Sequence, residues 1–226
     1  MTRAEPDGRR LAERLESLGA QAVLVPSIRV EFADPGPLDA ALRELGRYHW
    51  VIFTSRNGVE AVFRRTPTLA GPKVAAIGPS TAAGLRNHGV EPDLVPEKHV
   101  AEAILEALGG VKGLRILLPQ ADIARRALVN GLMEQGALVD EVVAYHTRTE
   151  RAPRPDLQAV DAVTFTSAST VRGFLESGPV PAGAAVVCIG PVTAQTAREH
   201  GLNVTEVAGD YSEDGLVAAL IAALKR

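Results

Sequence analysis

The chain contains two copies of one strand-and-turn pattern, 112 residues apart. The pattern reads Val-Ile-Phe-Thr-Ser-Arg-Asn-Gly-Val from Val51 to Val59 and returns as Val-Thr-Phe-Thr-Ser-Ala-Ser-Thr-Val from Val163 to Val171. A second pair of segments, Val74–Ala82 and Val186–Ala194, has the same spacing and shares Ile-Gly-Pro. Because solenoid repeats are about 20–50 residues long, this longer period indicates a duplicated domain with two similar lobes facing one ligand.

A further similarity occurs at a spacing of 117 residues. Arg9–Ala20 and Arg126–Ala137 share their leucine positions and a Gly-Ala ending. In the second copy the apolar segment Leu114–Leu118 leads into Pro119, but its counterpart would lie before Met1. We therefore expect the first strand of one lobe to be missing or nearly missing.

Composition excludes several classes of protein. The chain has 226 residues, 46% of them hydrophobic, which is enough for a core and one or two domains. A net charge of −3 and an aromatic content of 4% argue against nucleic-acid binding. The apolar runs are shorter than the roughly 20 residues of a membrane span, and no signal peptide is visible. The single cysteine, Cys188, lies in an apolar run typical of a buried strand, so we expect a cytoplasmic protein without disulfides.

Short apolar runs alternate with amphipathic segments along the whole chain. The runs predict strands at Ala22–Val25, Trp50–Phe53, Val74–Ile77, Ile116–Leu118, Val139–Ala144, Ala162–Phe165 and Val186–Ile189. The amphipathic segments predict helices that include Arg10–Leu18, Val100–Leu108, Ile123–Gln135 and Leu216–Leu224. Such alternation favours an α/β fold of two flavodoxin-like lobes, each a doubly wound parallel sheet.

The linkers suggest a discontinuous arrangement of these lobes. Arg29–Pro37 and His146–Pro155 are polar and carry spaced prolines, whereas Gly109–Gly113 is a tight join. We therefore predict one lobe from both ends of the chain, an inserted lobe, and two extended crossings between them. The predicted ranges are 1–30 plus 155–226 for the first lobe, 36–146 for the inserted lobe, and about 31–35 and 147–154 for the linkers.

Hydroxyl-bearing and glycine-bearing turns follow the predicted strands in both copies. Ligands of open α/β sheets bind at the carboxyl ends of the strands, where helix N-termini favour anions. The candidate binding residues at these turns are Thr54, Ser55, Arg56, Gly78, Ser80, Thr81, Ser167, Ala168, Gly190 and Thr193. Taken singly, each turn is better explained as a helix cap or a plain strand-to-helix turn; the duplication favours a carboxylate or phosphate site.

Tyr145 is the candidate for proton transfer. It lies where the predicted strand Val139–Ala144 ends, near the expected mouth between the lobes. An ordinary tyrosine stays protonated at neutral pH and can donate a proton; packing at a hinge is the alternative. The histidines lack metal-ligand spacing, and neither a GxGxxG nor a GxxxxGK[ST] motif occurs.

The ordered motifs resemble the uroporphyrinogen-III synthase family over nearly the whole chain. The resemblance is carried by Thr2-Arg3, Ile52–Ser55, Ala76–Thr81, Val143–Thr147, Phe165–Ser167, Ile189–Ala194 and Glu199–Leu202. It implies two flavodoxin-like lobes joined by a two-stranded linker, with a linear tetrapyrrole bound in the cleft. It also implies the lyase reaction of haem biosynthesis, in which hydroxymethylbilane loses water and closes to uroporphyrinogen III with ring D inverted.

On this resemblance we expect Tyr145 to act as general acid, and Arg3 and Arg56 to add positive charge around the substrate's carboxylates. No metal and no organic cofactor are expected. We expect a monomer that binds neither nucleic acid nor membrane and receives its substrate from hydroxymethylbilane synthase. Two alternatives remain open: a two-lobe small-molecule binding or sensor protein without catalysis, and a transferase acting on nucleotides or sugar phosphates.

Overall fold

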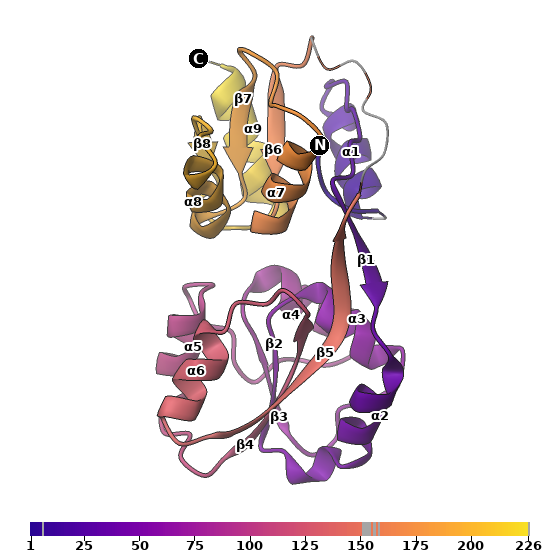
Figure 1. The fold of residues 1–226 in the computed structure, drawn as a ribbon, viewed down its shortest axis with the longest axis vertical. Helices are drawn as coiled ribbons and strands as arrows, with labels where there is room; N and C mark the ends of the chain where they lie inside the picture. Colours follow the sequence, from indigo (N-terminus) through magenta and orange to yellow (C-terminus); the bar gives the residue numbers. More distant parts are fainter. Residues whose placement is uncertain (6, 151–154, 156, 158, 226) are drawn as a thin grey trace. The chain divides into compact units, whose positions relative to one another are not determined.

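A computed structural model describes residues 1–5, 7–150, 155, 157 and 159–225 of the chain. The chain forms two compact units (Figure 1). We call residues 1–29 with 148–226 the split unit, and residues 30–147 the inserted unit. Each unit contains a parallel sheet with helices on both faces, which confirms the predicted α/β class.

The sheet of the inserted unit has five strands in the order β1-β5-β4-β2-β3. The strands are β1 (Ile28–Phe32), β2 (Trp50–Phe53), β3 (Lys73–Ala76), β4 (Arg115–Ala121) and β5 (Leu138–Thr149). All pairs among β2 to β5 are parallel, and a parallel bridge from Ala75 to Leu94 extends the edge beyond β3. With this bridge, the parallel strands counted along the chain lie in the order 3-2-1-4-5, which is an order of doubly wound parallel sheets.

Helices cover both faces of this sheet. One face carries α2 (Pro35–Arg43), α3 (Arg56–Phe63) and α4 (Pro79–Asn87), and the other carries α5 (Ala101–Leu108) and α6 (Ala127–Glu134); a 3-10 turn, η1, spans Leu45–Arg47. The strand residues Val51 and Phe53 pack on the first face, and Ile52 between them packs on the second. Burial on both faces explains why β2 reads as an unbroken apolar run.

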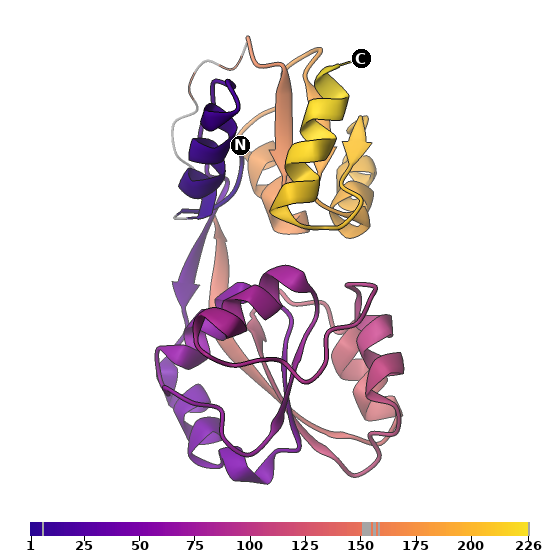
Figure 2. The ribbon, with the colours of Figure 1, turned by 180° about the vertical axis from the view of Figure 1, so that it is seen from behind.

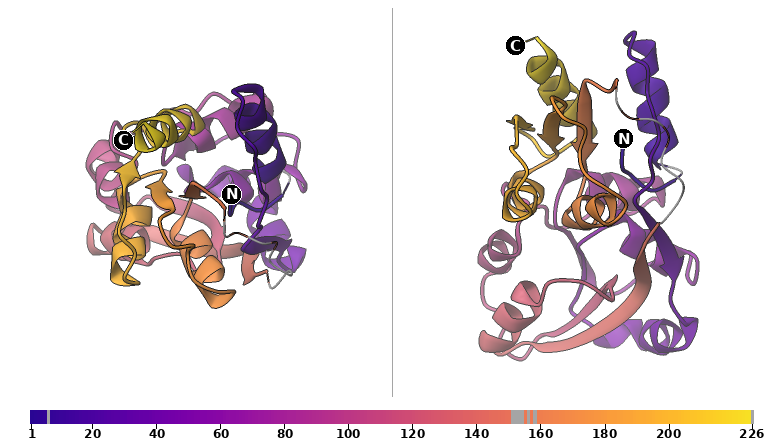
Figure 3. Two further views of the ribbon diagram at one scale, coloured as in Figure 1. Left: turned by 90° about the horizontal axis from the view of Figure 1, so that it is seen from above. Right: turned by 45° about the horizontal axis from the view of Figure 1, so that its top comes forward.

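The split unit repeats this design around a three-stranded sheet in the order β6-β7-β8. Its elements are α1 (Asp7–Ser17), β6 (Ala162–Phe165), α7 (Ala168–Glu176), β7 (Ala185–Cys188), α8 (Pro191–Glu199), β8 (Glu206–Val207) and α9 (Glu213–Leu224). Helices α1 and α9 pack on one face, and α7 and α8 on the other (Figures 2 and 3).

The boundary between the two units falls within β1 and β5, which are neighbours in the sheet. The amide of Ala33 donates to the Ala144 carbonyl, and the amide of Glu150 donates to the Ser27 carbonyl. The residue numbers of the bonded partners rise along one strand as they fall along the other, so these two strands are antiparallel. Both chain crossings are thus extended and hydrogen-bonded to each other.

Several predicted elements are wrong. No strand forms at Ala22–Val25; among the described residues, the backbone hydrogen bonds of this segment join Met1 to Val23 and Val25. Residues 123–126 are not helical, since a turn ties Ala124 to Ala121 and α6 begins only at Ala127.

The connections also differ from the prediction. Pro35 begins α2 rather than continuing an extended linker, because Asp34 caps the helix and proline suits its first turn. Strand β5 continues beyond Ala144 to Thr149 because β1 pairs with it. Within the predicted linker 147–154, residues 151–154 lie outside the described residues.

Candidate functional site

The turn after β2 in the inserted unit places Ser55 at the carboxyl edge of the sheet. Ser55 has extended backbone dihedrals and caps α3, since its Oγ accepts a hydrogen bond from the Gly58 amide at 3.0 Å. Thr54 and Arg56 flank it, and both are half-buried. The aliphatic part of Arg56 lies against α4, where a Cβ added to Gly84 would be 3.5 Å from the Arg56 Cγ.

Tyr145 reaches this turn from β5. Its side chain is 6% exposed, and its hydroxyl donates to the Ser55 Oγ at 2.9 Å. Burial raises the pKa of the phenol above its ordinary value of 10.0, and the nearby Asp122 carboxylate adds to this; hydrogen bonds with Ser55 and Asn57 oppose it. The phenol therefore stays protonated at neutral pH.

The two hydrogen bonds to Ser55 define what its hydroxyl can still do. A serine hydroxyl has two acceptor lone pairs and one hydrogen to donate. The Gly58 amide and the Tyr145 phenol occupy both lone pairs. Neither of these two hydrogen bonds uses the hydrogen of the Ser55 hydroxyl.

Asp122 holds the backbone around Tyr145 and is a residue that sequence reasoning missed. Its amide donates to the Tyr145 carbonyl at 3.0 Å, and its carboxylate accepts from the Thr147 amide at 3.1 Å. The same carboxylate lies 2.8 Å from the Nδ1 of His146. The ladder between β4 and β5 shifts register here, between Gln120 and Ala121. An aspartate directly after a buried strand was the available signal.

The glycine turns after β3 and β7 are each covered by a ring of the same unit. A Cβ added at Gly78 would lie 2.9 Å from the His99 ring, and one at Gly190 would lie 3.1 Å from the Tyr211 ring. Both glycines have extended backbone, with φ of −173° and −176°, so space rather than conformation demands glycine. The sequence pattern predicts close ligand approach at these glycines, whereas a ring of the chain fills the space above each of them.

His99 and Tyr211 lie 112 residues apart and so correspond in the repeat. Tyr211 has a left-handed φ of 56°, which is rare for a residue with a side chain. Asp210 fixes the turn by accepting from the amide and the hydroxyl of Ser212. The repeat spacing could have predicted that these two rings occupy corresponding positions in the two units.

The helices after these glycines begin without a side-chain cap. Among the described residues, neither Gly78 at α4 nor Gly190 at α8 has a capping hydrogen bond from a side chain. The first amides of a helix have no partner within the helix and attract anions. Ser80 is exposed at the start of α4, whereas Thr81 and Thr193 are buried, each 4% exposed.

The corresponding serine turn of the split unit has a different arrangement. Ser167 caps α7 by accepting from the Thr170 amide at 3.2 Å, and the Thr170 hydroxyl accepts from the Ser167 amide in return. The Oγ atoms of Ser167 and Ser169 lie 2.9 Å apart. Ala168 is the first residue of α7 and is half-buried. Among the described residues, the side-chain hydrogen bonds at this turn join Ser167 to Ser169 and Thr170 rather than to a tyrosine.

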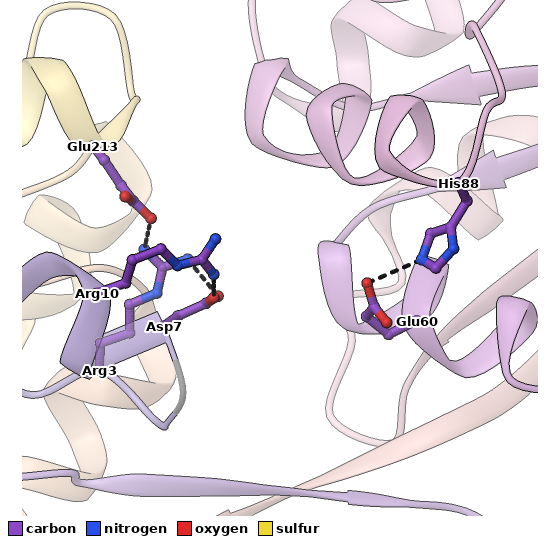
Figure 4. Close-up of polar contacts among 6 residues, drawn as sticks. All are labelled: Arg3, Asp7, Arg10, Glu60, His88 and Glu213. Carbon is purple, nitrogen blue, oxygen red and sulfur yellow. Dashed lines mark hydrogen bonds and ion pairs between the residues drawn. The ribbon is translucent and has the colours of Figure 1, made fainter.

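Arg3 is already held by carboxylates of the split unit (Figure 4). Its guanidinium donates to Glu213 at 2.6 Å and to Asp7 at 2.9 Å. These acids lie in the first turns of α9 and α1, where the helix dipole favours them. A substrate carboxylate at Arg3 would have to share or displace these partners. Figure 4 also shows His88, the C-cap of α4, with its Nε2 3.1 Å from Glu60.

The described residues contain no group of three or more histidine, cysteine, aspartate or glutamate side chains placed to hold a metal ion. In the same part of the chain, no helix combines the length and apolar character that crossing a bilayer requires. Cys188 is buried in β7, and burial raises the pKa of its thiol to about 11.

Comparison with known proteins decides the family. Residues 9–218 match the family model described as Uroporphyrinogen-III synthase HemD. The chain belongs to the uroporphyrinogen-III synthase family. Uroporphyrinogen-III synthase of Synechococcus elongatus is 31% identical over 249 residues, covering 97% of this chain and 92% of the relative. The chloroplastic uroporphyrinogen-III synthase of Oryza sativa subsp. japonica is 26% identical and covers 100% of this chain and 80% of the relative.

Solved structures of family members share the fold. A mutant uroporphyrinogen III synthase from the extremely thermophilic bacterium Thermus thermophilus superposes with a TM-score of 0.70 at 20% identity, covering 100% of this chain and 99% of that one. The Helicobacter pylori enzyme gives a TM-score of 0.62 at 18% identity, covering 90% and 93%. At these identities the likeness supports the two-domain α/β fold of the uroporphyrinogen-III synthases.

Proposed function

We propose that this protein converts hydroxymethylbilane to uroporphyrinogen III, with loss of water and inversion of ring D. Membership of the uroporphyrinogen-III synthase family supports the reaction. The hydrogen-bonded pair of Tyr145 and Ser55 is the observation that carries the chemical step, because it is a protonated, buried phenol behind a serine hydrogen at the carboxyl edge of a parallel sheet.

The proposed first step is assisted loss of the terminal hydroxyl group. The pyrrole nitrogen pushes electrons toward the hydroxymethyl carbon, and the carbon–oxygen bond breaks. Ser55 donates its hydrogen to the departing oxygen, and Tyr145 passes its own proton to Ser55 along their 2.9 Å bond. Water leaves, and an azafulvene cation remains near the phenolate. Such general acid catalysis contributes typically 10²–10⁴-fold.

The later steps need no further acid. The cation is attacked by the substituted carbon of ring D, and the resulting spiro intermediate fragments and recloses with ring D turned around. Loss of a proton from the ring carbon restores the Tyr145 phenol, so the net change is loss of one water. Since the unassisted closure gives the type I isomer, the protein must select a conformation of the substrate.

The carboxylates of the substrate provide the means of holding that conformation. The substrate carries eight carboxylates, whereas the chain has a net charge of −3. We assign their binding to helix N-termini, hydroxyls and the two arginines rather than to a basic surface. The proposed donors are those of Arg3, Thr54, Ser55, Arg56, Gly78, Ser80, Thr81, Ser167, Ala168, Gly190 and Thr193.

The decisive experiment resolves the isomers formed from freshly prepared hydroxymethylbilane. We expect predominantly uroporphyrinogen III in the presence of the protein, and type I in its absence. A small-molecule binding protein would leave type I as the product at the uncatalysed rate, which would refute the proposed function. A thermal shift with nucleotides and no change of isomer would instead favour the transferase alternative.

We further infer that the protein works as a cytoplasmic monomer that takes its substrate from hydroxymethylbilane synthase. A single, buried cysteine is consistent with a reducing compartment. Direct transfer would protect a substrate that closes by itself. Size-exclusion chromatography tests the monomer. Direct transfer is tested in a coupled reaction with the synthase, to which an unreactive carrier protein is added to trap free hydroxymethylbilane. If transfer is direct, the fraction of type III product should stay constant.

A further inference from the structure

Asn57 contacts the Tyr145 phenol and has no part in the steps proposed above. It is the second residue of α3, two positions after the cap Ser55, and it is half-buried. Its side chain hydrogen-bonds the Tyr145 hydroxyl, to which Ser55 is also bonded. Two side chains from the start of one helix thus hold the phenol oxygen.

The single hydrogen of the phenol fixes the direction of these two bonds. Tyr145 donates this hydrogen to the Ser55 Oγ at 2.9 Å. A second hydrogen bond at the phenol oxygen must therefore be donated to it. An asparagine side chain donates only through its NH2 group, so the nitrogen of Asn57, and not its oxygen, faces the phenol. Asn57 is thus a donor that can stay bonded after the phenol has lost its proton.

Close packing of the helix start against β4 supports this arrangement. A Cβ added at Gly58 would lie only 2.8 Å from the Pro119 carbonyl oxygen of β4. Glycine therefore lets the turn approach β4 more closely than a residue with a side chain could. The neighbouring strand β5 carries Tyr145 in its ladder with β4. The close approach at Gly58 thus brings Asn57 on the helix within reach of Tyr145 on the strand.

The split unit has neither an asparagine nor a tyrosine at the corresponding positions. At the repeat spacing of 112 residues, Asn57 corresponds to Ser169, whose Oγ lies 2.9 Å from that of Ser167. At the spacing of 117 residues, Tyr145 corresponds to Ile28. An amide at this helix position therefore accompanies the phenol and is not a general requirement of the turn. This comparison ties Asn57 to Tyr145 rather than to anion binding.

Proton donation by Tyr145 would leave a negative charge in a buried place. Burial and, to a smaller extent, the Asp122 carboxylate disfavour the phenolate and raise the pKa of the phenol, which is 6% exposed. The hydrogen bond from Asn57 opposes them, because a donor binds a charged oxygen more strongly than a neutral one. The first turn of α3 also presents the positive end of the helix dipole. Asn57 therefore lies where it can ease the formation of a phenolate.

We propose that Asn57 positions the proton donor: its amide holds the phenol with its hydrogen on Ser55 and stabilises the phenolate that is left behind. This inference rests on the proposed function, since the phenolate forms only if Tyr145 gives up its proton. In that step the Tyr145 O–H bond breaks, and its electron pair stays on the phenol oxygen. The proton moves to the Ser55 oxygen while the Ser55 hydrogen moves to the departing hydroxyl group. The proton later lost from the ring carbon restores the phenol, so Asn57 gains and loses no proton.

The test replaces Asn57 by aspartate, which has the same shape but accepts hydrogen bonds only when ionised. A carboxylate in the first turn of a helix is favourable, so Asn57→Asp should keep or raise the Tm. It should draw the phenol hydrogen away from Ser55, and its charge should oppose the phenolate. We expect kcat for uroporphyrinogen III formation to fall by roughly tenfold or more, with little change of KM. The control Asn130→Asp, at an exposed residue of α6, makes the same chemical change and should leave kcat unaltered.

A titration without substrate tests the contact itself. Tyr145 is replaced by difluorotyrosine, whose phenol ionises at a lower pH than that of tyrosine, and the absorbance of the phenolate reports its pKa. Asn57→Asp should raise this pKa by about one unit or more, whereas Asn130→Asp should leave it unchanged. Equal pKa values in the two aspartate variants would overturn the proposal.

A double-mutant cycle with Tyr145→Phe separates positioning from a structural role. If Asn57 acts through the phenol, Asn57→Asp should lower kcat when Tyr145 is present and should have no further effect in Tyr145→Phe. An equal fold-loss in both backgrounds would refute the inference. If the unmodified chain formed no type III isomer, the proposed function would fail, whereas the titration would still decide whether Asn57 stabilises the phenolate.

Discussion

The two units place a serine at the same turn but give it different partners. Ser55 accepts the Tyr145 phenol, whereas Ser167 interacts with Ser169 and Thr170 of its own helix. At the repeat spacing of 117 residues, the position of Tyr145 corresponds to Ile28 in the split unit. Under the proposed function, the repeat would supply anion-binding turns twice but the proton donor once, which suits a substrate with eight carboxylates and one hydroxyl group to lose.

The largest expected effect comes from removing the phenol. Tyr145→Phe should lower kcat by about 10²–10⁴-fold, because Ser55 then has no proton to relay. Product binding should change little, since the ring remains. The measurement is the initial rate of uroporphyrinogen III formation, with binding followed by fluorescence of the oxidised product.

Tyr48→Phe is the matched control for that variant. Tyr48 is also buried in the inserted unit and donates to Asp140 at 2.7 Å, away from Ser55. Its loss should cost about 0.5–1.5 kcal/mol of stability and leave kcat unchanged. An equal loss of kcat in both tyrosine variants would mean that the phenol of Tyr145 acts only through stability.

The second comparison removes the two serines. Ser55→Ala and Ser167→Ala each delete a helix cap, so both should lose about 0.5–2 kcal/mol in urea unfolding. Ser55→Ala should in addition lower kcat by roughly tenfold or more, because the relay is broken. Ser167→Ala should raise KM with little change of kcat. If the two variants lost kcat equally, the asymmetry between the units would have no catalytic meaning.

The sequence predicted the strands best where both faces are covered. Trp50–Phe53 and Ala162–Phe165 begin and end where expected, since each is an apolar run followed by a hydroxyl turn. Ala22–Val25 is also an apolar run, but among the described residues its backbone bonds only to Met1, so its pattern could not reveal that a strand would not form. A strand requires a partner, and the partner is a property of the fold.

The candidate site was predictable as a set of turns but not as a set of contacts. The bond between Tyr145 and Ser55 joins β5 to the turn after β2, with β4 between these strands in the sheet. A register shift between Gln120 and Ala121 pairs Ala121 with Tyr145, and no spacing in the sequence predicts this shift. The contact between the His99 ring and Gly78 likewise joins residues that are apart in the sequence.

The glycine turns provide a smaller test of the comparison. Gly78→Ala would press a methyl group against the His99 ring at 2.9 Å, and Gly190→Ala would meet Tyr211 at 3.1 Å. We expect destabilisation of about 1–3 kcal/mol for Gly78→Ala and less for Gly190→Ala. KM should rise severalfold, because the ring and the start of the helix move apart. Gly110→Ala, which meets no atom within 4 Å, is the control. If Gly190→Ala were more destabilising than Gly78→Ala, the Tyr211 ring would be the more rigid of the two.

The last prediction concerns pH and leaves turnover aside. Burial lowers the pKa of the Met1 amino group from 8.0 to about 6, so between these values the unfolded chain binds more protons than the folded one. The stability of the split unit should therefore rise from pH 6 to pH 8, by up to about 2–3 kcal/mol, and level off outside this window.

The measurement is amide hydrogen exchange, corrected for the intrinsic exchange rate at each pH. Exchange of the β7 amides reports the stability of the split unit, and exchange of the β2 amides reports that of the inserted unit. An extension of Gly-Ser-Arg-Ser-Ser ahead of Met1 puts a peptide amide in place of the amino group that donates to Val23, so it should abolish the slope in β7. A slope that survives the extension would show that the pH dependence does not come from the Met1 amino group.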